Sequence, residues 1–273
     1  MKNPKNCRYG IIQGRLTSPP NKELQCFPQN WKNEFTSAKK LGLSFIELFV
    51  ERNFNSSNPI WSEIGRNEII EESIKQNIDI YSSCSDYIIS NSILSDHTIL
   101  HLQNFIDASS QIGCELIILP LFGKSNVDLK DFIELKKIIR DLAKYSYKKN
   151  IIIGLETAFS PEENIELLEG INMRNSVKCV FDTGNRALLS EDIAGEIMQL
   201  GKWICHVHIK DKDYNDQNVT LGTGVINFME VFNAFSYINY DGPFVFETVR
   251  GKDPLKTAQY NINFCDYFYN ESL

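Results

Sequence analysis

The sequence predicts an α/β fold, a (β/α)8 TIM barrel in which eight parallel strands form a ring inside a layer of helices. Short apolar runs alternate with amphipathic helical segments along the whole chain, without a linker or a break in composition. The length of 273 residues also suits such a barrel, which typically needs about 250. An open doubly wound sheet is the alternative, but the turn after the first strand lacks the G-x-G-x-x-G pattern. We expect residues 1–273 to form one domain.

The expected strands are short runs rich in Ile, Leu, Val and Phe. They cover residues 9–13, 44–50, 78–84, 116–121, 151–156, 177–182, 204–211 and 242–247. The helices expected between them cover residues 31–41, 63–76, 97–112, 128–148, 191–200 and 227–235, with two more that begin near residues 161 and 254.

Capping residues fix several of these boundaries. Gly42 and Gly113 follow helical patterns and favour a left-handed end. The run Ser160-Pro161-Glu162-Glu163 combines a capping box with a proline at the first helical position. Asp128 is expected to cap the long helix after the fourth strand, and Asp253 to cap the last helix.

Composition excludes several classes of partner. The net charge of −7 and the pI near 5.2 argue against nucleic acid, which is bound largely through Lys and Arg. No signal-peptide core and no apolar run long enough for a bilayer occurs, so we expect a cytoplasmic protein without a membrane partner. The seven cysteines include no C-x-x-C pair, and Cys84, Cys179 and Cys205 fall inside expected strands, where we expect buried free thiols.

One strand carries polar side chains where aliphatic ones are expected. In the run Ile204-Cys205-His206-Val207-His208-Ile209-Lys210-Asp211, His206, His208 and Lys210 must point to the same face because side chains alternate along a strand. Buried polar groups need partners. This row therefore indicates a functional site.

The expected ends of strands five to eight supply such partners. They are Glu156, Asp182, His208 and Glu247, and in a barrel of this kind they all lie at the carboxyl-terminal face that carries the active site. Three carboxylates would repel one another without a counter-charge. One divalent cation resolves this, and the oxygen-rich set favours Mn²⁺, with Mg²⁺, Co²⁺ or Zn²⁺ as alternatives. We expect no nucleotide cofactor, because Gly123-Lys124-Ser125 lacks the earlier glycine of a P-loop.

Several motifs together resemble one family. The chain resembles the sugar phosphate isomerase/epimerase family, with its xylose-isomerase-like barrel. The motifs are Gly10-Ile11-Ile12-Gln13-Gly14-Arg15-Leu16, Gly154-Leu155-Glu156, Phe181-Asp182-Thr183-Gly184-Asn185, His206-Val207-His208-Ile209-Lys210-Asp211, Leu221-Gly222-Thr223-Gly224 and Phe246-Glu247-Thr248.

The resemblance implies roles for individual residues. It implies that Glu156, Asp182, His208 and Glu247 bind the metal, and that Glu156 and Glu247 also exchange protons with substrate, as in the related ketose 3-epimerases. Two substrate-contacting positions of those epimerases differ, because a histidine is replaced by Asn185 and an arginine by Tyr214. The candidate substrate contacts are Arg15, Glu47, Asn185, His206 and Lys210.

The expected function is therefore metal-dependent 3-epimerisation of a ketose or ketose phosphate by proton transfer through an enediolate, with aldose–ketose isomerisation also open. A dehydratase of the inosose type on the same site is an alternative, in which Lys210 and His206 would assist departure of hydroxide. An abasic-site endonuclease is disfavoured because the chain has only four histidines, too few for a trinuclear zinc site. A non-catalytic sugar-binding barrel and a homo-oligomer stay open.

Six positively charged residues follow expected strand ends and bear on the charge of the substrate. They are Arg15, Lys124, Arg186, Lys210, Arg250 and Lys252. Cations around a carboxylate-rich metal site favour a phosphorylated or carboxylated sugar, unless they pair with Asp211, Asp213 or Asp253. The turn at Gly222-Thr223-Gly224 is either a phosphate-binding loop or a plain turn.

Overall fold

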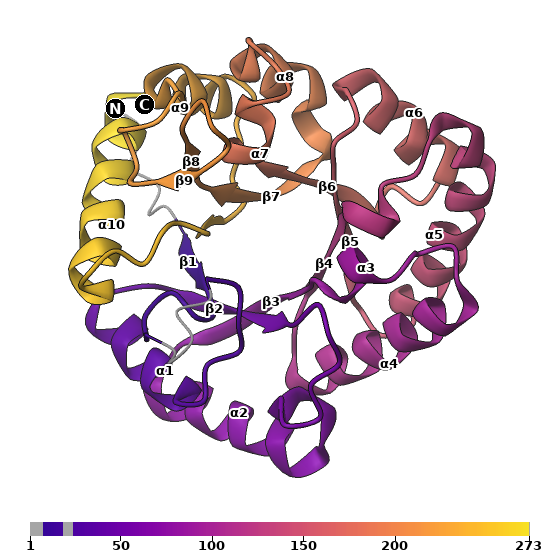
Figure 1. The fold of residues 1–273 in the computed structure, drawn as a ribbon, viewed down its shortest axis with the longest axis horizontal. Coiled ribbons are helices and arrows are strands. Elements are labelled where there is room, and N and C mark those ends of the chain that lie inside the picture. Colours follow the sequence, from indigo (N-terminus) through magenta and orange to yellow (C-terminus); the bar gives the residue numbers. More distant parts are fainter. Residues whose placement is uncertain (1–7, 19–23, 273) are drawn as a thin grey trace.

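A closed ring of eight parallel strands forms the centre of the computed structural model, which describes residues 8–18 and 24–272 (Figure 1). The strands are β1 (Tyr9–Ile12), β2 (Phe45–Val50), β3 (Asp79–Ser85), β4 (Leu116–Leu121), β5 (Ile152–Thr157), β6 (Val177–Asp182), β7 (Ile204–Ile209) and β10 (Phe244–Phe246). Their order around the ring is β1-β10-β7-β6-β5-β4-β3-β2. The predicted TIM barrel is confirmed.

Helices surround this ring (Figure 1). The longer ones are α1 (Trp31–Lys40), α2 (Glu63–Gln76), α4 (Asp96–Ile112), α5 (Phe132–Tyr147), α6 (Pro161–Ile171), α8 (Ile193–Leu200), α9 (Phe228–Tyr237) and α10 (Pro254–Glu271). Two short helices, α3 (Tyr87–Ser90) and α7 (Thr183–Ala187), and an antiparallel hairpin of β8 (Asp211–Lys212) and β9 (Asn218–Val219) follow strand ends. These short elements were not predicted, because two to five residues are too few to show a period.

Most expected caps are present. The capping box joins Ser160 and Glu163 in both directions, and the Asp253 side chain accepts a hydrogen bond from Lys256 N–H. The prediction for Asp128 was wrong. A 3-10 turn over Leu129–Asp131 comes before α5, so Asp128 lies one turn too early and makes no side-chain cap; its carboxylate lies 3.0 Å from Lys130 Nζ instead.

Two apolar layers follow from the alternation of side chains along the strands. Between the strands and the helices lies a large core to which β7 contributes Val207 and Ile209. A smaller cluster consists of Ile12, Phe45, Phe49, Cys84, Leu116, Ile118, Val180 and Val245. Its members alternate along each strand with residues of the outer core, so they belong to the inward face. Polar residues in phase with this cluster must therefore also point into the barrel.

No helix in the described ranges combines the length and the apolar composition that crossing a bilayer requires. Cys84, Cys179 and Cys205 lie in β3, β6 and β7 as free thiols, and Cys84 and Cys179 are buried. This agrees with the expectation that strand cysteines pack as small apolar side chains.

A buried ion pair joins the short helix α7 to α8. The Arg186 guanidinium donates to both Glu196 carboxylate oxygens, with Nε 2.6 Å from Oε2, and Nη1 lies 2.8 Å from Phe159 O. The two charged side chains are only 8% and 10% exposed. Arg186 is one of the six cations that follow expected strand ends, here called the rim cations. Its contacts make it a structural residue that joins α7 to its neighbours.

We predict that Glu196→Ala lowers the free energy of unfolding by about 3–5 kcal/mol, because it leaves the Arg186 charge buried without its partner. The matched control is Glu169→Ala, since the Arg174–Glu169 pair is more than half exposed and its loss should cost less than about 1 kcal/mol. Urea denaturation of both variants measures the difference. Equal costs would contradict the structural role of Arg186.

Candidate functional site

Six polar side chains point into the barrel, four of them at or near the carboxyl ends of its strands. They are Glu47 of β2, Glu156 of β5, Asp182 of β6, His206 and His208 of β7, and Glu247 directly after β10. The register places Asp182 and His208 side by side, and His208 is also paired with Val245, two residues before Glu247. All six residues are at most 5% exposed. The ring thus collects four carboxylates and two imidazoles in one buried region.

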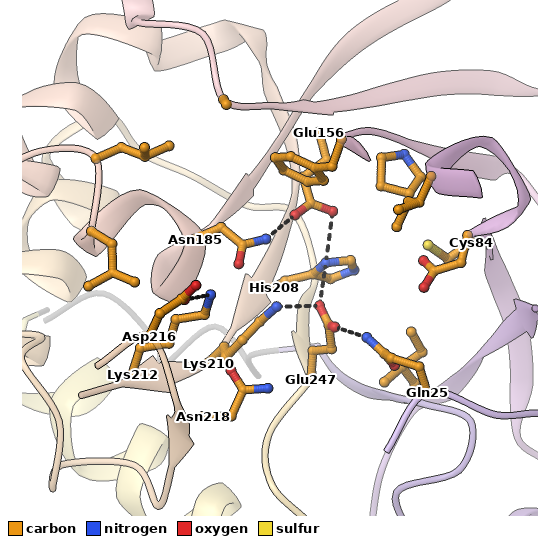
Figure 2. Close-up of a pocket in the computed structure, with 18 of the residues that line it drawn as sticks. Gln25, Cys84, Glu156, Asn185, His208, Lys210, Lys212, Asp216, Asn218 and Glu247 are labelled. Atoms are coloured by element: carbon orange, nitrogen blue, oxygen red, sulfur yellow. Dashed lines mark hydrogen bonds and ion pairs between the residues drawn. The ribbon is translucent and has the colours of Figure 1, made fainter. Parts of the chain in front are cut away.

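His208 is the centre of this group (Figure 2). Its Nδ1 atom lies 3.2 Å from Glu247 Oε2, 3.6 Å from Glu156 Oε2 and 3.8 Å from Asp182 Oδ2. In Figure 2 the carboxylates of Glu156 and Glu247 approach the imidazole from opposite sides. Three carboxylate oxygens therefore converge on one ring nitrogen.

The Glu47 carboxylate contacts both histidines at their Nε2 atoms. It lies 3.0 Å from His208 Nε2 and 2.8 Å from His206 Nε2, and it accepts a hydrogen bond of 2.7 Å from Ser82 Oγ. Burial would raise the pKa of Glu47, but His208 and His206 outweigh burial and lower that pKa to about 2. An ionised Glu47 facing Nε2 leaves Nδ1 of His208 facing the other three carboxylates.

Lys210 supplies positive charge on the other side of the cluster. Its Nζ lies 2.9 Å from Asp182 Oδ2 and 3.1 Å from Glu247 Oε2. Burial alone would lower the pKa of Lys210, but Asp182 and Glu247 raise it above its ordinary value. Burial raises the pKa of Asp182 to about 6 even though Lys210 opposes the shift. One ammonium thus offsets only part of the buried negative charge.

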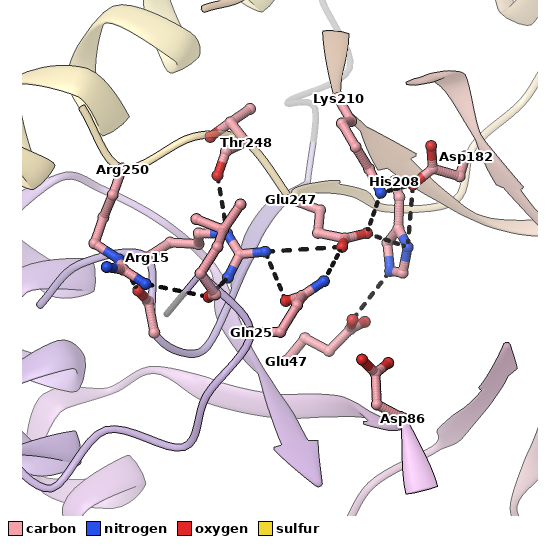
Figure 3. A network of polar contacts seen from close by, with 12 residues as sticks. Arg15, Gln25, Glu47, Asp86, Asp182, His208, Lys210, Glu247, Thr248 and Arg250 are labelled. Carbon is pink, nitrogen blue, oxygen red and sulfur yellow. Dashed lines mark hydrogen bonds and ion pairs between the residues drawn. The ribbon is translucent and has the colours of Figure 1, made fainter. Parts of the chain in front are cut away.

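Side-chain hydrogen bonds orient the two outer carboxylates. Asn185 Nδ2 donates to Glu156 Oε1 over 2.7 Å, and Gln25 Nε2 donates to Glu247 Oε1. Gln25 in turn accepts a 2.8 Å hydrogen bond from Arg15 Nη2 (Figure 3). The pKa of Glu247 is well below its usual range, because Lys210 and His208 outweigh the opposing effect of burial.

The arrangement fits a divalent metal ion. Atoms of Glu156, Asp182 and His208 lie within 4.8 Å of one another, as a shared ligand site requires. His208 Nδ1 is buried and makes no hydrogen bond to a described residue, although acidic oxygens surround it. Glu47 at Nε2 orients the ring as a carboxylate partner of a metal-binding histidine does. A second grouping of Glu47, His206 and His208 also has ligand spacing, but both imidazoles already face that carboxylate.

A cavity of about 530 Å³ opens onto this cluster, a volume in the range of small-molecule sites. Glu156, His208, Lys210 and Glu247 line it on one side (Figure 2). Other polar lining residues are Gln25, Arg52, Asp86, Asn185, Lys212, Asp216 and Asn218, and apolar ones include Phe122, Leu188 and Leu189. The cavity can therefore admit a small polar molecule next to the convergent carboxylates.

The candidate substrate contacts divide into two groups. Asn185 and Lys210 line the cavity, whereas Arg15, Glu47 and His206 do not. Arg15 is 2% exposed and donates to Thr248 O and to Gln25, so it lies behind Glu247 (Figure 3). Glu47 and His206 lie on the Nε2 side of His208, away from the cavity, and are fully buried.

The expected rim cations are mostly engaged elsewhere. Lys210 alone among the six lines the cavity. Arg250 donates to Gly14 O and Leu24 O, while Lys124 and Lys252 are exposed. None of the six is paired with Asp211, Asp213 or Asp253 in the described part of the chain; Lys212 pairs with Asp216 and Lys256 with Asp253.

The glycine turn after β7 has an internal partner. Gly222 N–H and Gly224 N–H both donate over 2.9 Å to Asp211 Oδ2. A Cβ on Gly224 would lie 2.2 Å from Asp211 Oδ1, so the close approach needs glycine. These amides therefore bind a carboxylate of the chain itself, which favours the plain-turn interpretation over a phosphate-binding loop.

Several cavity residues were missed from the sequence, among them Gln25 and Asp86. Gln25 lies in the irregular loop after β1, where no periodic pattern marks it. Asp86 follows the end of β3 in phase with Ser82 and Cys84, two inward-facing residues, and continuing that alternation by one step would have identified it.

Comparisons with known proteins agree with this architecture. A family model described as a xylose isomerase-like TIM barrel matches residues 35–267. L-ribulose-5-phosphate 3-epimerase of Shigella flexneri is 22% identical over 234 residues, 80% of this chain and 81% of that protein. An uncharacterised protein of Methanocaldococcus jannaschii is 29% identical over 140 residues, so the matched part spans about half of each chain.

The fold is shared with solved structures at low sequence identity. D-psicose 3-epimerase of Clostridium cellulolyticum H10, a structure with D-tagatose, superposes with a TM-score of 0.75 at 17% identity, covering 96% of this chain and 99% of that one. The family model spans most of the sequence, so it identifies the family directly. The chain belongs to the xylose isomerase-like TIM-barrel family.

Proposed function

We propose that the protein is a divalent-metal-dependent carbohydrate epimerase that inverts C3 of a ketose or ketose phosphate by proton transfer through an enediolate. The main support for this proposal is the convergence of the Glu247, Glu156 and Asp182 carboxylates on His208 Nδ1. They lie beside a cavity of a size that suits a small molecule. The relatives named for 3-epimerase activity support the choice of reaction.

Two carboxylates on opposite sides of a bound ketose suit inversion at carbon. Glu156 and Glu247 both line the cavity and both reach His208 Nδ1 within 3.6 Å. Either one would remove the C3 proton from its own face, and the other would return a proton to the opposite face. Reversal of the reaction exchanges their roles, so neither carboxylate needs to be permanently the acid.

The remaining residues hold these groups in place. Glu156, Asp182, His208 and Glu247 would hold the ion, most suitably Mn²⁺, which would acidify the C–H bond and stabilise the enediolate charge. Asn185 and Gln25 fix the orientation of Glu156 and Glu247 through their amide N–H groups. Two of the three N–H groups of Lys210 face Asp182 and Glu247. The third would donate to a substrate oxygen, because Lys210 lines the cavity.

We predict that Glu156→Gln and Glu247→Gln each reduce kcat by about 10²–10⁴-fold, because each removes one proton-transfer group while keeping the side chain's shape. The measurement is incorporation of solvent deuterium at C3 of pentuloses and hexuloses. Glu71→Gln, on the exposed surface of α2, is the control and should retain wild-type turnover. A product lighter than the substrate by one water would instead establish a dehydratase.

We also predict that chelation abolishes turnover and that Mn²⁺ restores it. At 100 times its dissociation constant, the ion should raise the melting temperature by about 5–10 °C, because binding stabilises only the folded state. His208→Ala should lose this shift, whereas His97→Ala, which removes an exposed imidazole on α4, should keep it. Elemental analysis should find one ion per chain, and three zinc ions would contradict the proposal in favour of a nuclease-type site.

A further inference from the structure

One buried carboxylate in the cavity has no part in the reaction proposed above. Asp86 follows β3, and its side chain is 6% exposed. Its backbone N–H donates to Val50 O, but its carboxylate does not cap α3, the helix that begins beside it. Figure 3 shows this carboxylate pointing toward the space near Glu247 and His208 without a contact to either.

The ring order places Asp86 across the barrel from His208. Between β3 and β7 lie β4, β5 and β6 on one side and β2, β1 and β10 on the other, so the two strands are opposite each other. His208 of β7 and Asp86 after β3 both line the cavity. A sugar chelated near His208 would extend its far end toward Asp86.

The partner of Asp86 leaves room for a ligand. Arg52 Nε lies 3.5 Å from Asp86 Oδ2, at the long limit of a hydrogen bond, and the Arg52 side chain is 56% exposed. Burial raises the pKa of Asp86 to about 7, with the Glu247 charge adding to the effect, so nearby negative charge is already unfavourable there. A further anion at this position would meet the same repulsion.

The other cavity cations leave little positive charge for a phosphate. The described lining contains three, namely Arg52, Lys210 and Lys212. Each already has a carboxylate partner, respectively Asp86, Asp182 with Glu247, and Asp216. A hydroxyl group suits the Asp86–Arg52 pair better, because it can donate to the carboxylate and accept from the guanidinium.

We propose that Asp86, together with Arg52, binds a hydroxyl group at the end of the ketose remote from the metal site, and that it selects an uncharged ketose over its terminal phosphate ester. This inference rests on the proposed epimerase function and names the substrate class. It differs from the expectation drawn from the six rim cations, five of which do not line the cavity.

The test compares free and phosphorylated substrates in matched pairs. Pentuloses and their 5-phosphates, and hexuloses and their 6-phosphates, are assayed with Mn²⁺ by deuterium exchange at C3. The wild type should show a kcat/KM at least about 10-fold higher for the neutral member of the pair that it turns over best. Faster turnover of the phosphorylated member would overturn the inference while leaving the epimerase function standing.

Variants assign the preference to Asp86. Asp86→Asn keeps the shape but removes the charge, and it should shift the kcat/KM ratio toward the phosphate ester by at least about 10-fold, mainly through KM. Asp128→Asn removes an exposed carboxylate outside the cavity and should leave the ratio unchanged. A ratio that moves less than about 2-fold in Asp86→Asn would overturn the inference.

Arg52 gives an independent check should the Asp86 variant fail to fold, since its exposed side chain makes Arg52→Ala a mild substitution. Removing the guanidinium takes away the donor to the terminal hydroxyl group, so kcat/KM for the neutral ketose should fall at least as much as that for the phosphate ester. If Arg52 bound a phosphate instead, the same variant would lower kcat/KM for the phosphate ester by a larger factor than that for the neutral ketose, which would overturn the inference. Absence of exchange with every ketose would contradict the epimerase proposal itself, and this inference with it.

Discussion

Four buried carboxylates at one mouth of the barrel impose the constraint on which the surrounding structure depends. Glu47, Glu156, Asp182 and Glu247 are each at most 5% exposed. Each buried charge needs hydrogen bonds or a counter-charge to offset its lost hydration. The chain meets this need in two layers, with His206, His208 and Ser82 around Glu47, and Lys210 between Asp182 and Glu247.

The two layers contact different ring nitrogens of His208. Glu47 faces Nε2, and the other carboxylates face Nδ1. A proton and a metal ion would compete for Nδ1, because both need the same lone pair. The carboxylates raise the pKa of His208 against the effect of burial, so they attract whichever cation is present. The geometry that stabilises a protonated imidazole would therefore also suit the proposed role of His208 as a metal ligand.

The sequence was most informative where periodic strand patterns determined direction. Alternation along residues 204–211 correctly brought His206 and His208 to one face, and the carboxyl-end rule grouped Glu156, Asp182 and Glu247 around them. It was less informative for loops. Arg15 and Arg186 follow strands as expected, yet Arg15 donates to Thr248 O and Gln25, and Arg186 to Phe159 O and Glu196. Only the three-dimensional fold brings these partners within reach. The position of Gln25 likewise depends on the path of the loop after β1.

This difference has a physical origin that bears on function. Inward positions of the ring are fixed by hydrogen-bond register, so a one-residue shift would turn every side chain outward. Gln25, Arg52 and Lys212 lie outside the eight strands of the ring, so no ring register fixes their positions, and they line the cavity together with residues of the ring. Under the proposed function, the ring would therefore hold the reacting groups, and the residues outside it would determine which substrate fits. Asp86 lies at the boundary between the two, because it continues the alternation of β3 and also lines the cavity. The selectivity proposed for Asp86 would therefore be tied to the register of the barrel.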